Sequence, residues 1–276
     1  MINLFNYIQR ESPIHHLTGA TKLVCMLLWS FAAMIGFDPR LLAALTVFSA
    51  LLFAVSKIRV KDVRFMLGFT AAFMLMNNLM IFLFSPEHGV SIYGTRTVLF
   101  PIIGRYIVTK EQLFYQLNVV LKYFATIPVV LLFVSTTCPS EFAASLNRIG
   151  VNYRIAYAVS LALRYIPDIQ REYHDISLSL QARGVELGKD VKFTRRIKNA
   201  AQVLFPLIMS SMDRIETVSS AMELRGFGKN KRRTWYAAED FTKWDYLAMA
   251  VCVGLLGVSL LLMRVNGGRF YNPFLP

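Results

Sequence analysis

The 276-residue chain carries 30 lysine and arginine residues against 17 acidic residues, yet 55% of its residues are hydrophobic and only 17% are charged. Soluble domains have about 25% charged residues, so this composition excludes an ordinary soluble basic domain. The three cysteines are far apart in the sequence, which favours buried apolar thiols over a disulfide framework or a zinc site.

Long uncharged stretches predict an all-α integral membrane protein with about five transmembrane helices. The predicted spans cover approximately 21–37, 40–56, 65–84, 113–135 and 245–263. Each has about 17 to 23 residues, enough to cross a hydrocarbon layer of ~30 Å. The first 20 residues contain charged and polar side chains instead of a continuous apolar stretch, so no cleavable signal peptide is expected.

Lysine and arginine beside the spans predict the orientation, because positively charged loops stay on the cytoplasmic side. The basic loop 57–64 is therefore predicted to be cytoplasmic, together with the N-terminus. Alternation places 85–112 outside, as an irregular loop interrupted by prolines and glycines, and 136–243 inside. We expect a multi-pass protein of the cell (plasma) membrane.

This topology divides the chain into three parts. They are an N-terminal membrane region with four spans (1–135), a cytoplasmic region with two long helices (136–243), and a C-terminal span with a short external tail (244–276). Inside the spans, the Asn77-Asn78 pair is expected to hydrogen-bond to a neighbouring helix, and Lys122 to snorkel or to pair with the external loop.

Apolar residues at alternating steps of three and four predict two amphipathic helices in the cytoplasmic region. In the first helix, within 154–183, they are Val159, Ala162, Ile166, Ile169, Tyr173, Ile176 and Leu180. In the second helix, about 195–225, the stripe is Ile197, Ala201, Leu204, Ile208, Ser211, Ile215, Val218 and Met222. On the opposite face of the first helix, Arg164 with Asp168 and Arg171 with Asp175 have the spacing of exposed ion pairs.

A proline lies inside each predicted helix, Pro167 in the first and Pro206 in the second. Proline removes a backbone hydrogen bond and bends a helix, so both residues are expected to shape these helices. The alternative is that each proline ends one helix and starts another.

Both helices finish in the same way, in Ala182-Arg183-Gly184 and Leu224-Arg225-Gly226. One interpretation is an ordinary helix stop, because glycine adopts the left-handed cap conformation and arginine meets the negative end of the helix dipole. The other is docking to a partner, since an exposed guanidinium presents a fork of donors to carbonyls or carboxylates on another protein. The duplication of the motif favours docking.

The two motifs follow Arg164-Tyr165-Ile166-Pro167 and Phe205-Pro206, and the N-terminal segment contains Ser12-Pro13-Ile14-His15-His16-Leu17. Together these features resemble the transmembrane T component of energy-coupling factor (ECF) transporters, the EcfT/CbiQ family, over nearly the whole chain. In the second motif Leu224 stands where the first has Ala182, and Thr18-Gly19-Ala20 replaces the Asp-Pro-Arg common in that family.

The resemblance implies a non-catalytic coupling subunit whose two arginine motifs dock into grooves on two ABC-type ATPase subunits. It also implies a membrane-embedded substrate-binding S component, with uptake of a vitamin or related micronutrient. Cobalt or nickel import by the same family is the alternative, and a stand-alone secondary transporter is less favoured. Proton-coupled carriers usually carry ionisable groups inside their spans, and the predicted spans hold no acid away from their edges.

The sequence shows no phosphate-binding loop, catalytic constellation or metal-ligand motif, so we expect no ATPase activity, cofactor or metal site in this chain. A basic run follows the second motif, at Lys229, Lys231, Arg232 and Arg233. Beside a membrane span this run is expected to meet solvent or anionic membrane lipid, and not nucleic acid.

Overall fold

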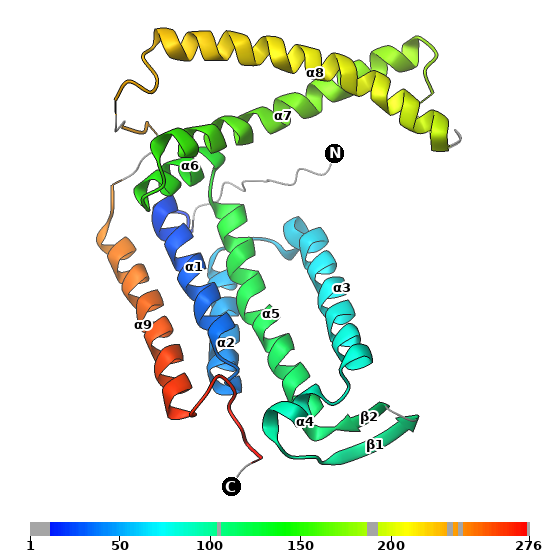
Figure 1. Cartoon of the computed structure of the whole chain (residues 1–276). Coiled ribbons are helices and arrows are strands. Elements are labelled where there is room, and N and C mark those ends of the chain that lie inside the picture. Colours follow the sequence, from blue (N-terminus) through cyan, green and yellow to red (C-terminus); the bar gives the residue numbers. More distant parts are fainter. Residues whose placement is uncertain (1–11, 104–105, 187–192, 231–233, 237–239, 275–276) are drawn as a thin grey trace. The chain divides into compact units, whose positions relative to one another are not determined.

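The computed structural model describes residues 12–103, 106–186, 193–230, 234–236 and 240–274. The described chain is mostly α-helical, which confirms the predicted fold class (Figure 1). It forms two compact units: the first is Met1–Cys138 with Glu239–Pro276, and the second is Pro139–Ala238.

Five helices of the first unit are apolar. They are α1 (Gly19–Ile35), α2 (Pro39–Val55), α3 (Val60–Phe84), α5 (Lys110–Thr136) and α9 (Lys243–Val265). Helices α3, α5 and α9 are long and apolar enough to cross a membrane, while α1 and α2 have 17 residues each. Seventeen residues are at the lower limit of the usual length, about 17 to 25, for crossing a bilayer.

Tight contacts hold α1 against α5 and α9, and α2 against α5. The core of this bundle is Trp29, Ala33, Leu41, Leu42, Leu45, Ala125, Val129 and Cys252. Trp29 of α1 donates its indole N–H to the carbonyl of Ala125 in α5 at 2.9 Å, and Ser259 of α9 donates to the carbonyl of Ala32 at 2.9 Å. Such bonds satisfy polar side chains among apolar helices.

The segment between α3 and α5 differs from the predicted irregular loop. It contains a short helix, α4 (His88–Tyr93), and a hairpin of β1 (Val98–Ile103) and β2 (Tyr106–Thr109). Proline fits here because both strands of a two-stranded sheet are edge strands and the register is irregular around Pro101. The prediction of an irregular loop was therefore wrong. The prolines and glycines of this segment interrupt short elements and do not exclude regular structure.

The polar residues of the spans also bond differently from the prediction. Asn78 donates to the carbonyl of Met74 in its own helix at 3.0 Å, because a helical asparagine reaches the preceding turn. The link to the neighbouring helix comes from Gln116, which donates to the backbone carbonyl of Asn78 at 3.2 Å. Lys122 donates to the carbonyl of Met34 at 2.9 Å, and its ammonium lies 3.2 Å from the ring centre of Phe37.

The second unit contains α6 (Pro139–Arg148), α7 (Tyr153–Ala182) and α8 (Phe193–Leu224). Helices α7 and α8 match the predicted ranges 154–183 and 195–225 closely. At ~1.5 Å per residue, each is about 45 Å long. Pro167 lies inside α7 and Pro206 inside α8, so neither proline ends a helix.

Candidate functional site

The ends of α7 and α8 have the same backbone geometry. After α7, the N–H of Gly184 bonds to the carbonyl of Gln181 at 2.9 Å, and the N–H of Val185 bonds to the carbonyl of Leu180 at 3.0 Å. This paired pattern is the Schellman motif, in which the residue after the cap adopts a left-handed conformation. Gly184 does so, with a φ of 84°.

After α8 the pattern repeats residue for residue. The N–H of Gly226 bonds to the carbonyl of Glu223 at 2.8 Å, and the N–H of Phe227 bonds to the carbonyl of Met222 at 2.9 Å. Gly226 has a φ of 63°. Each arginine is thus held at one defined position, one residue before a left-handed glycine.

Side chains at both ends are open to solvent. Ala182 and Arg183 are exposed, as are Leu224 and Arg225, and Leu224 is 90% exposed. We refer to 182–184 and 224–226 as the two arginine tips. An arginine fork at an exposed, rigid helix end can reach carbonyl or carboxylate groups of another protein.

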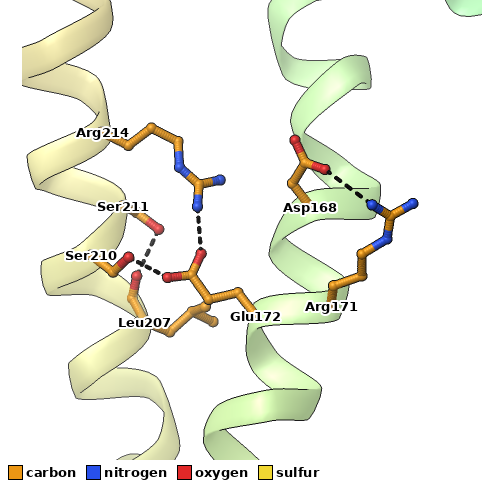
Figure 2. A network of polar contacts seen from close by, with 7 residues as sticks. All are labelled: Asp168, Arg171, Glu172, Leu207, Ser210, Ser211 and Arg214. Carbon is orange, nitrogen blue, oxygen red and sulfur yellow. Dashed lines mark hydrogen bonds and ion pairs between the residues drawn. The ribbon is translucent and has the colours of Figure 1, made fainter.

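A polar contact joins α7 to α8 at their crossing (Figure 2). Glu172 of α7 accepts a hydrogen bond from Arg214 of α8 at 2.8 Å and another from Ser210. The guanidinium of Arg214 also lies 5.6 Å from the ring centre of Tyr165 on α7. Because Glu172 and Arg214 are partly buried, this pair fixes the position at which the helices cross.

Contacts along the pair show that α7 and α8 are antiparallel. Successive contacts join Glu186 to Asn199, Glu172 to Arg214, and Tyr157 to Phe227. The two arginine tips therefore lie at opposite ends of the pair (Figure 1). The meeting residues Glu172 and Arg214 lie eleven residues before Arg183 and Arg225, so the tips are roughly 33 Å apart at ~1.5 Å per residue.

The two tips differ in their surroundings. Phe227, just after the second tip, packs against Tyr157 and Tyr153 with ring centres 4.8 and 5.7 Å apart. Arg154 donates to the carbonyl of Gly228 at 2.7 Å. The start of α7 thus supports the second tip, and Leu224 remains exposed beside it as the larger counterpart of Ala182.

The face of α8 that packs differs from the predicted apolar stripe. Its buried residues are Asn199, Val203 and Leu207, while Ile208 and Ile215 of the stripe are 52% and 66% exposed. Apolar periodicity predicts which face of a helix avoids water, and it does not predict which protein element covers that face. We refer to Ile197, Leu204, Ile208 and Ile215 as the apolar α8 face.

Sequence reasoning also missed the residues that join the helices. Arg171 pairs with Asp168 at 3.9 Å, and not with Asp175 as its spacing suggested. The sequence pattern singled out neither Glu172 nor Arg214. The sequence does contain one indication of this pair. Glu172 and Arg214 have opposite charges, and each precedes the arginine at the end of its helix by eleven residues.

Two expected features can be compared with the described part of the chain. No group of three or more histidine, cysteine, aspartate or glutamate residues in it could hold a metal ion. Lys231, Arg232 and Arg233 of the predicted basic run lie outside the described residues.

Known proteins resemble this chain over most of its length. A family model described as "Cobalt transport protein" (CbiQ) matches residues 10–236. The energy-coupling factor transporter transmembrane protein EcfT of Staphylococcus aureus is 24% identical over 270 residues, which cover 95% of this chain and 96% of the relative. The EcfT protein of Streptococcus thermophilus is 26% identical over 268 residues, covering 94% and 97%. With EcfT of Limosilactobacillus fermentum the identity is 34% over 118 residues, 43% of each chain.

Proposed function

Since the chain belongs to the EcfT/CbiQ family of transmembrane components of energy-coupling factor transporters, we propose that it couples two cytoplasmic ABC-type ATPases to a membrane-embedded S component. The chain itself has no catalytic role in this proposal. It transmits the movement of the ATPases to the subunit that binds the substrate.

The observation that carries this proposal is the pair of arginine tips on one crossed helix pair. Two equivalent tips roughly 33 Å apart suit two ATPase subunits, one on each tip. The Glu172–Arg214 contact between the tips ties α7 to α8, so a displacement of one helix moves the other. In this proposal Pro167 in α7 and Pro206 in α8 determine the direction of each helix axis between its start and its tip.

In this proposal the S component contacts the apolar α8 face. Ile197, Leu204, Ile208 and Ile215 are between 48% and 66% exposed, and a subunit embedded in the membrane presents apolar surface that would cover them. In this arrangement the ATPases bind the ends of the helix pair and the S component binds its side.

The proposed location is the cell membrane, with the N-terminus and the helix pair on the cytoplasmic side. The functional division follows 1–135 as four spans, 136–243 as the coupling region, and 244–276 as the last span with its tail. The basic segment 57–64, which the structure divides between a short turn and the start of α3, supports this orientation, because positive charge beside a span remains inside.

The proposed substrate is a vitamin or related micronutrient, recognised by the S component. Cobalt or nickel is the second candidate, because the description of the matching family model names cobalt transport.

Co-expression with the neighbouring genes tests the proposed function. The chain should co-purify with ATPase subunits and an S component, and the complex should take up substrate into liposomes when ATP is supplied. The chain purified alone should neither hydrolyse ATP nor transport. Uptake by the isolated chain in liposomes would instead identify a stand-alone secondary transporter.

A further inference from the structure

The first unit contains a cavity of about 980 Å³ between α1, α2, α5 and α9. The cavity is open on one side, since Phe48 and Val251 of its lining are 41% and 44% exposed, so a second molecule can enter it. Its volume is at the upper end of the ~300 to 1,000 Å³ typical of sites for small molecules.

The deep walls of the cavity are apolar. They include Trp29, Phe48, Val129 and Val251, one from each of the four helices. An apolar cavity is a poor site for water, since a buried water needs two to four polar partners. Within a bilayer, hydrocarbon chains are the apolar material at hand to fill it.

Polar residues line one end of the same cavity. Ser12, His16 and Lys22 come from the start of the chain and of α1, Thr136 ends α5, and Thr242 caps α9. Lys22 holds this end together by donating to the carbonyls of His15 and Thr136, both at 3.1 Å. Trp29, Val129 and Val251 lie seven to nine residues further along their helices, about 10 to 14 Å deeper.

One basic side chain, that of Lys22, lines the polar end. Val55, another lining residue, is followed within ten residues by Lys57, Arg59, Lys61 and Arg64, at the end of α2 and the start of α3. A basic pocket between membrane helices on the cytoplasmic side attracts the phosphate of an anionic lipid.

We propose that this cavity binds one anionic phospholipid, with an acyl chain against Trp29, Phe48, Val129 and Val251 and its phosphate at the end lined by His16 and Lys22. The bound lipid fills the space between α1, α2, α5 and α9 and so stabilises their packing. This proposal depends on the membrane location of the chain and not on the coupling function.

The test is native mass spectrometry of the full chain after reconstitution in vesicles of equal parts phosphatidylglycerol and phosphatidylcholine. The wild-type chain should retain one phosphatidylglycerol, several-fold in preference to phosphatidylcholine. Ala248 lines the cavity and Ala250 on the same helix does not, so Ala248→Trp should reduce lipid occupancy at least tenfold while Ala250→Trp leaves it within twofold.

If Ala248→Trp does not fold, the smaller Ala248→Leu is compared with Ala250→Leu and should show an intermediate loss. Two results would overturn the proposal: no phospholipid on the wild-type chain, or equal occupancy in the two members of the folded pair. Phospholipid retained only by a variant lacking residues 1–11 would also overturn it, because the chain's own first residues would then be the occupant.

Discussion

The carboxylate of Glu172 meets the guanidinium of Arg214 at 2.8 Å, and each of the two residues lies eleven positions before the arginine that ends its helix. At ~1.5 Å per residue the crossing point is about 16 Å from each arginine tip. The contact therefore divides the pair symmetrically with respect to Arg183 and Arg225. The distance from a tip to the crossing is therefore the same for both helices.

Removing the Glu172 carboxylate tests the crossing. Glu172→Ala leaves Arg214 and Ser210 without their shared acceptor, and a hydrogen bond to a charged group contributes about 1.5 to 3 kcal/mol. We expect the assembled transporter to retain its ATPases but to show uptake reduced severalfold per ATP hydrolysed. Uptake and ATP hydrolysis are measured on the same proteoliposomes.

Arg171→Ala is the matched control for Glu172→Ala. Arg171 pairs with Asp168 at 3.9 Å with its side chain 77% exposed, so this pair contributes at most about 1 kcal/mol. Uptake by this variant should equal that of the wild type. An equal loss of uptake in Arg171→Ala and Glu172→Ala would contradict this prediction. It would show that any substitution in this part of α7 impairs transport.

The glycine of each tip is required for its backbone conformation. Gly184 has a φ of 84°, and an added Cβ would meet no atom within 4 Å, so strain and not collision sets the cost of substitution. Gly184→Val should lower ATPase retention more than Gly184→Asn, because asparagine tolerates the left-handed region and a β-branched residue does not. Co-purification of the ATPases measures this difference, and equal retention by both variants would contradict it.

Asp245 joins the starts of α1 and α9. Its carboxylate accepts from the N–H of Thr18 at 2.9 Å and from the N–H of Thr242 at 2.8 Å, and the residue is fully buried. Asp245→Ala removes one half of the capping box at the start of α9 and leaves the buried N–H of Thr18 without its acceptor, at a cost of about 1 to 3 kcal/mol. Thermal unfolding in detergent should occur at a lower temperature, whereas Asp213→Ala, at an exposed position of α8, should leave it unchanged.

Labelling of introduced cysteines tests the orientation. Asn272 donates to the carbonyl of Tyr93 at 3.0 Å, which places the tail after α9 beside the end of α4. In a chain whose native cysteines are replaced, Ser91→Cys and Pro273→Cys should both react with an impermeant maleimide added outside cells. Lys61→Cys at the start of α3 should react only after permeabilisation, and its labelling in intact cells would reverse the orientation.

The sequence pattern predicted the helix ends correctly, because a helix end depends on residues that are neighbours in the chain. Gly184 and Gly226 marked the ends of α7 and α8, because a left-handed cap depends on the few residues around it. The packed face of α8 could not be predicted in this way. Val203 and Leu207 are buried while Ile208 and Ile215 are exposed, since burial depends on the position at which α7 crosses. That position depends on Glu172 and Arg214, which are 42 residues apart in the chain.

Both arginine tips anchor ATPases in the proposed complex. The Arg183→Ala, Arg225→Ala double variant tests this role most directly. A charge-assisted hydrogen bond contributes about 1.5 to 3 kcal/mol, so each single Arg→Ala change should weaken ATPase binding roughly 10- to 150-fold. Two contacts on one body reinforce each other, so the double variant should lose the ATPases during purification, and Arg→Lys at both positions should restore only part of the binding. Arg195→Ala, near the start of α8, should retain them. If the double variant keeps its ATPases through purification and supports uptake at the wild-type rate, the two arginine tips are only helix stops and the coupling role assigned to them is wrong.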